Sequence, residues 1–108
     1  MIVTLAERKK ARVEGIRSGV ERLRGELADY ARRHGGRFWL YGSAASGELR
    51  YDSDVDVLVD FEADVLSAAV VFAEDACARH GLKPDIKPKS CCTDAFVRRI
   101  MPKALVLP

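Results

Sequence analysis

Residues 41–61 read YGSAASGELRYDSDVDVLVDF, and this stretch decides how the chain folds. Its first half is a turn in which glycines enclose small and polar residues. Its second half alternates aspartates with valines, and a period of two is typical of a β-strand that buries one face. We therefore expect a strand over 54–61, with Asp54 and Asp56 on the face opposite its valines.

Regular patterns on both sides of this stretch predict further elements. In three segments apolar residues recur every three or four positions, which is the pattern of an amphipathic helix. These segments are 4–34, 64–80 and 92–101. Aromatic residues predict a short strand over 37–41, and prolines bound an extended segment over 83–88, expected at a sheet edge. With 108 residues there is room for one core, so we expect a single domain over 1–108.

Two apolar surfaces leave the state of assembly open. The stripe along the helix over 4–34 has the seam spacing of a coiled coil. It either packs across this chain's own sheet or contributes to an interface with another chain. The apolar tail over 104–108 likewise either packs back or meets a partner. A homo- or hetero-oligomer through the N-terminal helix or the C-terminal tail is therefore one of the outcomes we consider.

Composition argues against several classes of protein. No apolar run is long enough to span a bilayer, and the first residues lack the long apolar core of a secretion signal. Three cysteines, two of them adjacent, form a poor disulfide framework and indicate a reducing compartment. Basic side chains are interleaved with acidic ones and lack clustered aromatic residues, which argues against a nucleic-acid partner. We expect a cytoplasmic protein with no membrane association.

The aspartate pair suits a divalent metal. Residues 41–75 hold nine acidic residues against one arginine, a net charge of −8, and such crowding is costly unless cations or basic neighbours neutralise it. Carboxylates two residues apart on a strand share one face at roughly 7 Å, and hard cations prefer oxygen ligands. Two-metal phosphoryl-transfer sites call for a further carboxylate. Asp85, on the next extended segment, is the first candidate and Asp52 the second.

The turn before the aspartates suits a phosphate. Gly42-Ser43 at the end of a strand allows close backbone approach and exposes amide donors, and the serine hydroxyl can bond a phosphate oxygen. Gly47 allows a tight return toward the next strand. The Gly-Lys-Ser/Thr of a Walker loop is absent. Together, the turn and the aspartates indicate chemistry on a nucleoside triphosphate.

The complete pattern resembles a known superfamily. Gly42-Ser43, ten intervening residues, Asp54-x-Asp56 and the apolar run that follows are similar to the signature of the nucleotidyltransferases related to DNA polymerase beta. Ser53 before the first aspartate also matches, and the resemblance covers about residues 38–100. More specifically, the chain resembles the minimal nucleotidyltransferases, called MNT domains, which are antitoxin partners of HEPN toxins.

This resemblance implies an α/β (α+β) fold, with a small mixed sheet of three or four strands packed against helices. It also implies an active site that binds Mg²⁺ and ATP. The triphosphate-binding residues would be Gly42, Ser43, Gly47 and Ser53, and the catalytic, metal-binding residues Asp54, Asp56 and Asp85. Asp85 would also help to deprotonate the acceptor hydroxyl. Relatives of this kind transfer AMP from ATP to a tyrosine of a HEPN toxin and so silence its ribonuclease activity.

The sequence departs from the pattern at one informative position, and other functions stay open. Many relatives carry an arginine where Ser46 stands, so Arg50, Lys87 or Lys89 is a candidate to replace it. A binding module that neutralises a toxin without catalysis is one alternative. An adenylyltransferase acting on a small molecule or RNA is another, and a partner chain would then have to hold the acceptor.

Overall fold

The computed structural model describes residues 3–108, in which helices and strands alternate along the chain. In order they are α1 (Leu5–His34), β1 (Arg37–Tyr41), α2 (Ser43–Ser46), β2 (Asp54–Asp60), α3 (Ala63–Arg79), β3 (Lys83–Pro88), η1 (Lys89–Cys91), α4 (Asp94–Ile100), η2 (Met101–Lys103) and β4 (Leu105–Leu107). The elements η1 and η2 are short turns of 3₁₀-helix. Each helix and strand that the sequence predicts is present.

The four strands form one mixed sheet in the order β3-β2-β1-β4. Strand β1 pairs antiparallel with β2 and with β4, whereas β2 and β3 are parallel. Parallel neighbours need a crossover connection, and α3 supplies it. The expected small mixed sheet packed against helices is confirmed, and β3 lies at the edge as its prolines predict.

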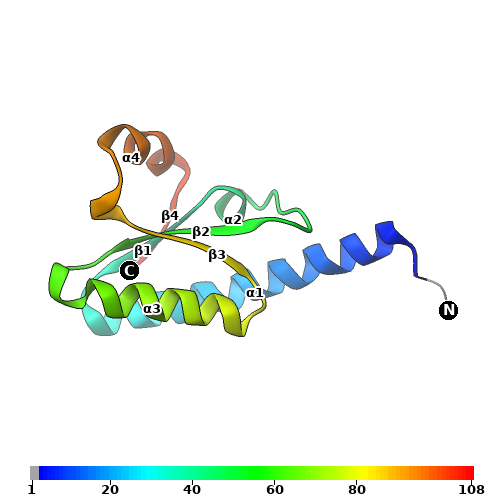
Figure 1. The fold of residues 1–108 in the computed structure, drawn as a ribbon, viewed down its shortest axis with the longest axis horizontal. Coiled ribbons are helices and arrows are strands. Elements are labelled where there is room, and N and C mark those ends of the chain that lie inside the picture. Colours follow the sequence, from blue (N-terminus) through cyan, green and yellow to red (C-terminus); the bar gives the residue numbers. More distant parts are fainter. Residues whose placement is uncertain (1–2) are drawn as a thin grey trace.

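The helices cover the two faces of the sheet differently (Figure 1). Helices α1 and α3 lie side by side along one face, and α4 lies on the other side. The core fills the space between the sheet and the α1–α3 pair. Its largest fully buried members are Phe38, Ile16, Leu23, Leu27, Leu40, Val55, Val57, Val59 and Cys77. The valines of β2 face this core, so alternation turns the aspartates toward the α4 side.

Helix α1 begins and ends at clear sequence signals. The hydroxyl oxygen of Thr4 accepts a hydrogen bond from the Glu7 N–H at 3.1 Å, and Gly35 ends the helix in the left-handed conformation, with φ 73°. The apolar stripe packs on this chain's own sheet. Residues 3–12 are exposed, and this end of α1 projects past the body of the molecule (Figure 1).

The C-terminal tail packs back onto the chain. Strand β4 pairs with β1, and Leu107 is buried while its neighbour Val106 is exposed. Helix α4 is shorter than predicted because Thr93 caps its start and the 3₁₀ turn η2, which contains Pro102, follows its end. None of the helices in residues 3–108 combines the length and the apolar character that a membrane span requires.

Candidate active site

Three neighbouring strands place one aromatic and two acidic residues in a row. Asp56 on β2 lies opposite Tyr41 on β1 and opposite Asp85 on β3. Directly opposed residues share a face of the sheet, so all three side chains belong to the α4 side. Asp54 precedes Asp56 by two residues, is exposed, and lies opposite Lys83. The sequence-predicted carboxylate of Asp85 therefore lies beside that of Asp56.

Gly42 lies against the central carboxylate of this row. Its backbone has φ 65° and ψ −146°, a conformation that residues other than glycine rarely adopt. A Cβ atom built at this position would lie 2.5 Å from Asp56 Oδ2. A glycine is thus needed at the end of β1 both for the turn and for the approach of Asp56.

The two paired carboxyl groups have opposite electrostatic environments. Burial, followed by a hydrogen bond and charge repulsion from Asp85, raises the pKa of Asp56 to about 6. The Lys87 ammonium group lies 2.7 Å from Asp85 Oδ1, and its hydrogen bond lowers the pKa of Asp85. Asp85 is therefore the carboxylate that stays ionised as the pH falls, and Asp56 is the one that takes up a proton.

The turn after β1 borders a pocket. Residues Ser43–Ser46 form the short helix α2, and Gly47 ends it in the left-handed conformation, its N–H donating to the Ser43 carbonyl. A pocket of about 460 Å³ lies here. Its lining residues are Gly42, Ser43, Ser46, Glu48 and Lys103. Gly42 lines the pocket and also lies against Asp56, so the pocket adjoins the acidic row.

Known protein families and solved structures include relatives of this chain. The sequence profile of the nucleotidyltransferase domain matches residues 20–106. The chain belongs to this nucleotidyltransferase family. It is also similar to a solved structure named a "putative minimal nucleotidyltransferase", with 26% sequence identity and a TM-score of 0.65 over 80% of this chain and 93% of that one. None of the curated proteins compared with the chain matches it.

The acidic row of this nucleotidyltransferase suits magnesium in its chemistry. Within residues 3–108 no three His, Cys, Asp or Glu side chains are grouped as a ready-made metal cage. Mg²⁺, however, keeps several waters and is usually held by one or two carboxylates together with substrate phosphates. Asp56 and Asp85 could supply two oxygen ligands, and a cation there would relieve the repulsion that, together with burial, raises the pKa of Asp56.

Two serines near the nucleotidyltransferase site hold the turn in shape. The Ser53 hydroxyl oxygen accepts a hydrogen bond from the Arg50 N–H at 2.7 Å, and the Ser46 hydroxyl oxygen accepts one from the Glu48 N–H at 3.2 Å. The hydrogen bond of Ser53 therefore holds the turn that immediately precedes β2. The role of Ser53 toward a nucleotide stays a prediction.

The structure adds Lys103 to the basic residues that the sequence offered for this site. Lys103 lines the pocket beside Gly42, and no motif in the sequence links it to that turn. Lys87, one of the three candidates considered for the missing arginine, contacts Asp85. Lys89, another candidate, lies 3.7 Å from Asp60, at the opposite end of β2 from Asp54. In the sequence, Lys87 could be linked to Asp85 because residues that lie two apart on a strand share one face of the sheet.

Proposed function

We propose that this nucleotidyltransferase transfers AMP from ATP to a tyrosine hydroxyl of a HEPN-type helical toxin and thereby acts as its antitoxin. One observation carries the proposal: Asp56 and Asp85 lie opposite each other on adjacent strands, with the Gly42 backbone against Asp56 and a pocket beyond it. A paired acidic site that adjoins a glycine-serine turn can hold a metal and a polyphosphate side by side.

The role that we propose for each residue of the site follows from its position in the structure. Gly42, Ser43 and Lys103 line the pocket, and the amide groups of the first two and the ammonium group of Lys103 would bind the phosphates. Asp56 and Asp85, with Asp54 beside them, would hold Mg²⁺, which supplies neutralisation of the charge that develops on the phosphates. Strand β3 is an edge strand and Asp85 is partly exposed, so Asp85 is the carboxylate that an incoming acceptor can reach.

The reaction balances with these groups. The acceptor hydroxyl oxygen attacks the α-phosphorus and forms a new P–O bond, while Asp85 takes the proton of that hydroxyl. The bond between the α-phosphorus and the bridging oxygen breaks, and pyrophosphate leaves with the electron pair. Lys103 and the amides of the turn would steady the leaving group, because positive and donor groups favour the charge that it gains.

A protein acceptor is supported by the exposure of the acidic residues of the site. The sheet has helices α1 and α3 on one face and the short α4 on the other, and all four strands belong to one sheet. Substrates that an enzyme must orient need surfaces around the reacting atoms. A partner that brings its own tyrosine supplies such surfaces, and this is why we propose a folded protein over a free small molecule.

The test combines purified protein, magnesium, ATP labelled at the α-phosphate, and a HEPN-type protein as the candidate acceptor. We expect label on the partner, and its loss when a partner tyrosine is changed to phenylalanine. Asp56→Asn should abolish labelling. Asp60→Asn is the matched control, because Asp60 lies on the same strand but pairs with Lys89. A tight complex without label would overturn catalysis and favour the binding module instead.

A further inference from the structure

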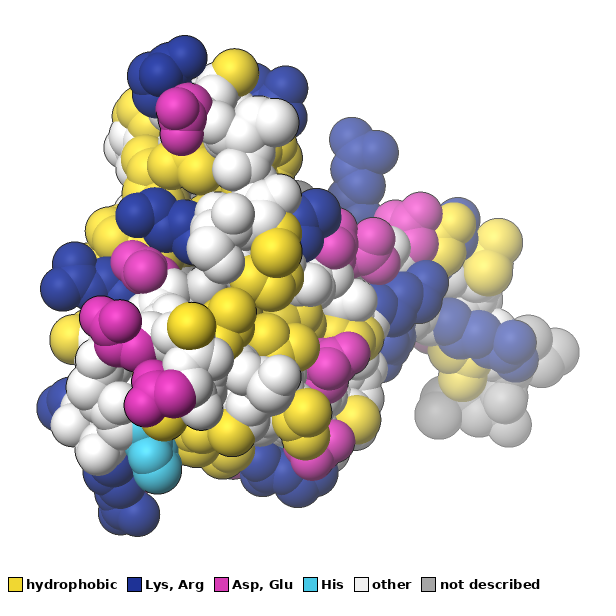
Figure 2. All heavy atoms as spheres, turned by 60° about the vertical axis from the view of Figure 1, so that its left-hand side comes forward, with side chains coloured by type: hydrophobic (Ala, Val, Ile, Leu, Met, Phe, Trp, Pro, Cys, Tyr) yellow, Lys and Arg dark blue, Asp and Glu magenta, His cyan; other side chains and the backbone are white. Residues whose placement is uncertain are grey.

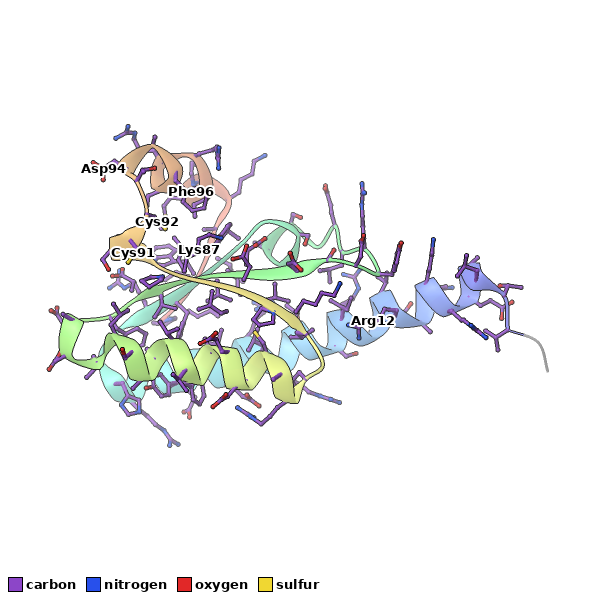
Figure 3. The ribbon with its side chains drawn as sticks, viewed as in Figure 1. Arg12, Lys87, Cys91, Cys92, Asp94 and Phe96 are labelled. Carbon is purple, nitrogen blue, oxygen red and sulfur yellow. The ribbon has the colours of Figure 1, made fainter. Side chains whose placement is uncertain are left out.

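Lys87 is a basic residue next to the acidic row, opposite Leu58 on β2, and the proposed chemistry gives it no role. It follows Asp85 by two residues on β3, so both side chains point to the same side of the sheet. That side faces α4, and Lys87 lies beneath Phe96 in Figure 3. The Lys87 Nζ atom donates a hydrogen bond to Asp85 Oδ1 at 2.7 Å. A positive charge thus occupies the neighbourhood in which a metal is expected.

We infer that Lys87 is the resident counter-cation of the Asp56–Asp85 pair, that it must leave Asp85 before a divalent metal binds there, and that the released ammonium group then binds the triphosphate. This inference rests on the proposed function. It gives the site a preference: metal that arrives with a nucleotide binds better than metal alone, because the nucleotide provides a new partner for Lys87.

The surroundings of Lys87 allow such an exchange. Its side chain and that of Asp85 are both 41% exposed, so the ion pair is partly solvated and can separate without burying a bare charge. A lysine ammonium group is a compact charge on a flexible four-carbon stem, which can reach more than one acceptor. Close by, the Tyr41 hydroxyl is buried and has no hydrogen-bond partner within residues 3–108. Asp85 is the hydrogen-bonded partner that holds Lys87.

A purely structural ion pair is the competing explanation, and it predicts different measurements. An edge-strand pair that only stabilises β3 would change unfolding when it is removed and would leave ligand affinities alone. A counter-cation in the site predicts opposite shifts for two ligands. Loss of the positive charge strengthens the binding of a free cation and weakens the binding of an anionic metal–nucleotide complex.

The experiment measures Mn²⁺ affinity by electron paramagnetic resonance at low salt, alone and with a non-hydrolysable ATP analogue. For Lys87→Met we expect Mn²⁺ alone to bind about three- to tenfold tighter and the Mn²⁺–analogue complex about three- to tenfold weaker than in the unmodified protein. Lys87→Arg keeps the charge and should restore both affinities. Lys89→Met is the matched control, because Lys89 pairs with Asp60 and should move neither affinity.

Each outcome decides the matter. Shifts of the same sign for both ligands, or no shift for Lys87→Met, overturn the inference. If the unmodified protein binds Mn²⁺ neither alone nor with the analogue, the metal site of the proposed function fails and the inference fails with it. Opposite shifts without any transfer to a partner uphold the exchange while contradicting the proposed transfer. Circular dichroism checks folding, and Lys87→Gln replaces the methionine variant if that variant is unfolded.

Discussion

At Gly42 the main chain adopts a conformation with φ 65° and ψ −146°, and a Cβ atom there would lie 2.5 Å from Asp56 Oδ2. Gly42→Ala therefore strains the backbone and pushes the Asp56 carboxylate away. We expect a loss of about 1–3 kcal/mol in the free energy of unfolding, measured with urea, and a loss of metal–nucleotide binding measured by titration calorimetry.

Gly25 offers a matched control for that substitution. It lies within α1, is exposed, and has no atom of another part of the chain within 4 Å of the place that a Cβ atom would occupy. Gly25→Ala should raise the free energy of unfolding by up to about 1 kcal/mol, because alanine is the better helix former. If Gly42→Ala proved as harmless as Gly25→Ala, the close approach of Asp56 to the turn would be contradicted.

Asp56 gives a pH-dependent prediction. Its pKa is raised to about 6, mainly by burial and then by Asp85, so the native state holds a proton that the unfolded chain has already lost between about pH 4 and 6. The contribution of Asp56 to the free energy of unfolding is therefore fully present at low pH and is lost as the pH rises through 6. Asp56→Asn should be about 1–2 kcal/mol more stable than the unmodified protein at pH 7.5 and equal to it near pH 4.

Urea unfolding at the two pH values measures this difference, and Asp60→Asn is the control, since Asp60 lies outside the acidic row. A destabilised Asp56→Asn protein at pH 7.5 would mean that the carboxylate is held by favourable contacts and is not under repulsion. If Asp56→Asn gains stability and loses AMP transfer, Asp56 is a catalytic residue that lowers the stability of the protein.

Residues of the site differ in how far the sequence could predict them. Gly42, Ser43, Asp54 and Asp56 lie within fifteen residues of one another, so turn chemistry and strand alternation alone predict their grouping. The place of Asp85 depends on the parallel pairing of β2 with β3, which the sequence did not predict. The resemblance offered Asp85 as the third carboxylate, and the register shows it opposite Asp56. Tyr41 could be assigned to β1 but not to the row, because its neighbours depend on strand register.

At the scale of elements, β4 is the piece whose position the sequence left open. Its three residues alternate between exposed Val106 and buried Leu107, which is too short a pattern to predict a strand. Pairing of β4 with β1 holds the preceding turn η2 at the end of the sheet and so brings Lys103 to the pocket. The ends of α1 were better predicted, because Thr4 and Gly35 are local signals that need no partner.

The return of the C-terminal segment gives a prediction for Lys103. Lys103→Ala should weaken the binding of the ATP analogue about three- to tenfold while leaving thermal stability unchanged, since an exposed lysine that contacts phosphate contributes about 1 kcal/mol. Lys10→Ala removes the same charge from the projecting end of α1 and should have no such effect. Equal affinities for the two variants would exclude Lys103 from the phosphate pocket.

At the scale of the whole molecule, α1 sets the shape. Its 30 residues extend about 45 Å at 1.5 Å per residue, close to the longest dimension of 53 Å. Basic and acidic side chains are intermingled on the face shown in Figure 2, while the projecting end of α1 behind them carries several basic groups. The body that holds the site and the projecting end of α1 therefore differ in surface character.

The projecting end of α1 leads to a prediction about the whole chain. Residues 3–12 are exposed, and Arg12 makes one hydrogen bond with the Gly81 carbonyl, while the buried stripe begins at Ile16. Removal of residues 1–11 should therefore lower the free energy of unfolding by less than about 1 kcal/mol, because residues 3–11 contribute a helix cap and the contact of Lys9 with the exposed Tyr51 ring but no buried residue. Metal and nucleotide affinities should stay unchanged in calorimetry.

Leu23→Ala, which opens a cavity in the core beneath the same helix, serves as the contrast and should lower the free energy of unfolding by about 2–5 kcal/mol. A truncated chain as unstable as Leu23→Ala would show that the end of α1 is held by contacts beyond those seen within this chain, as an assembly of several chains would provide.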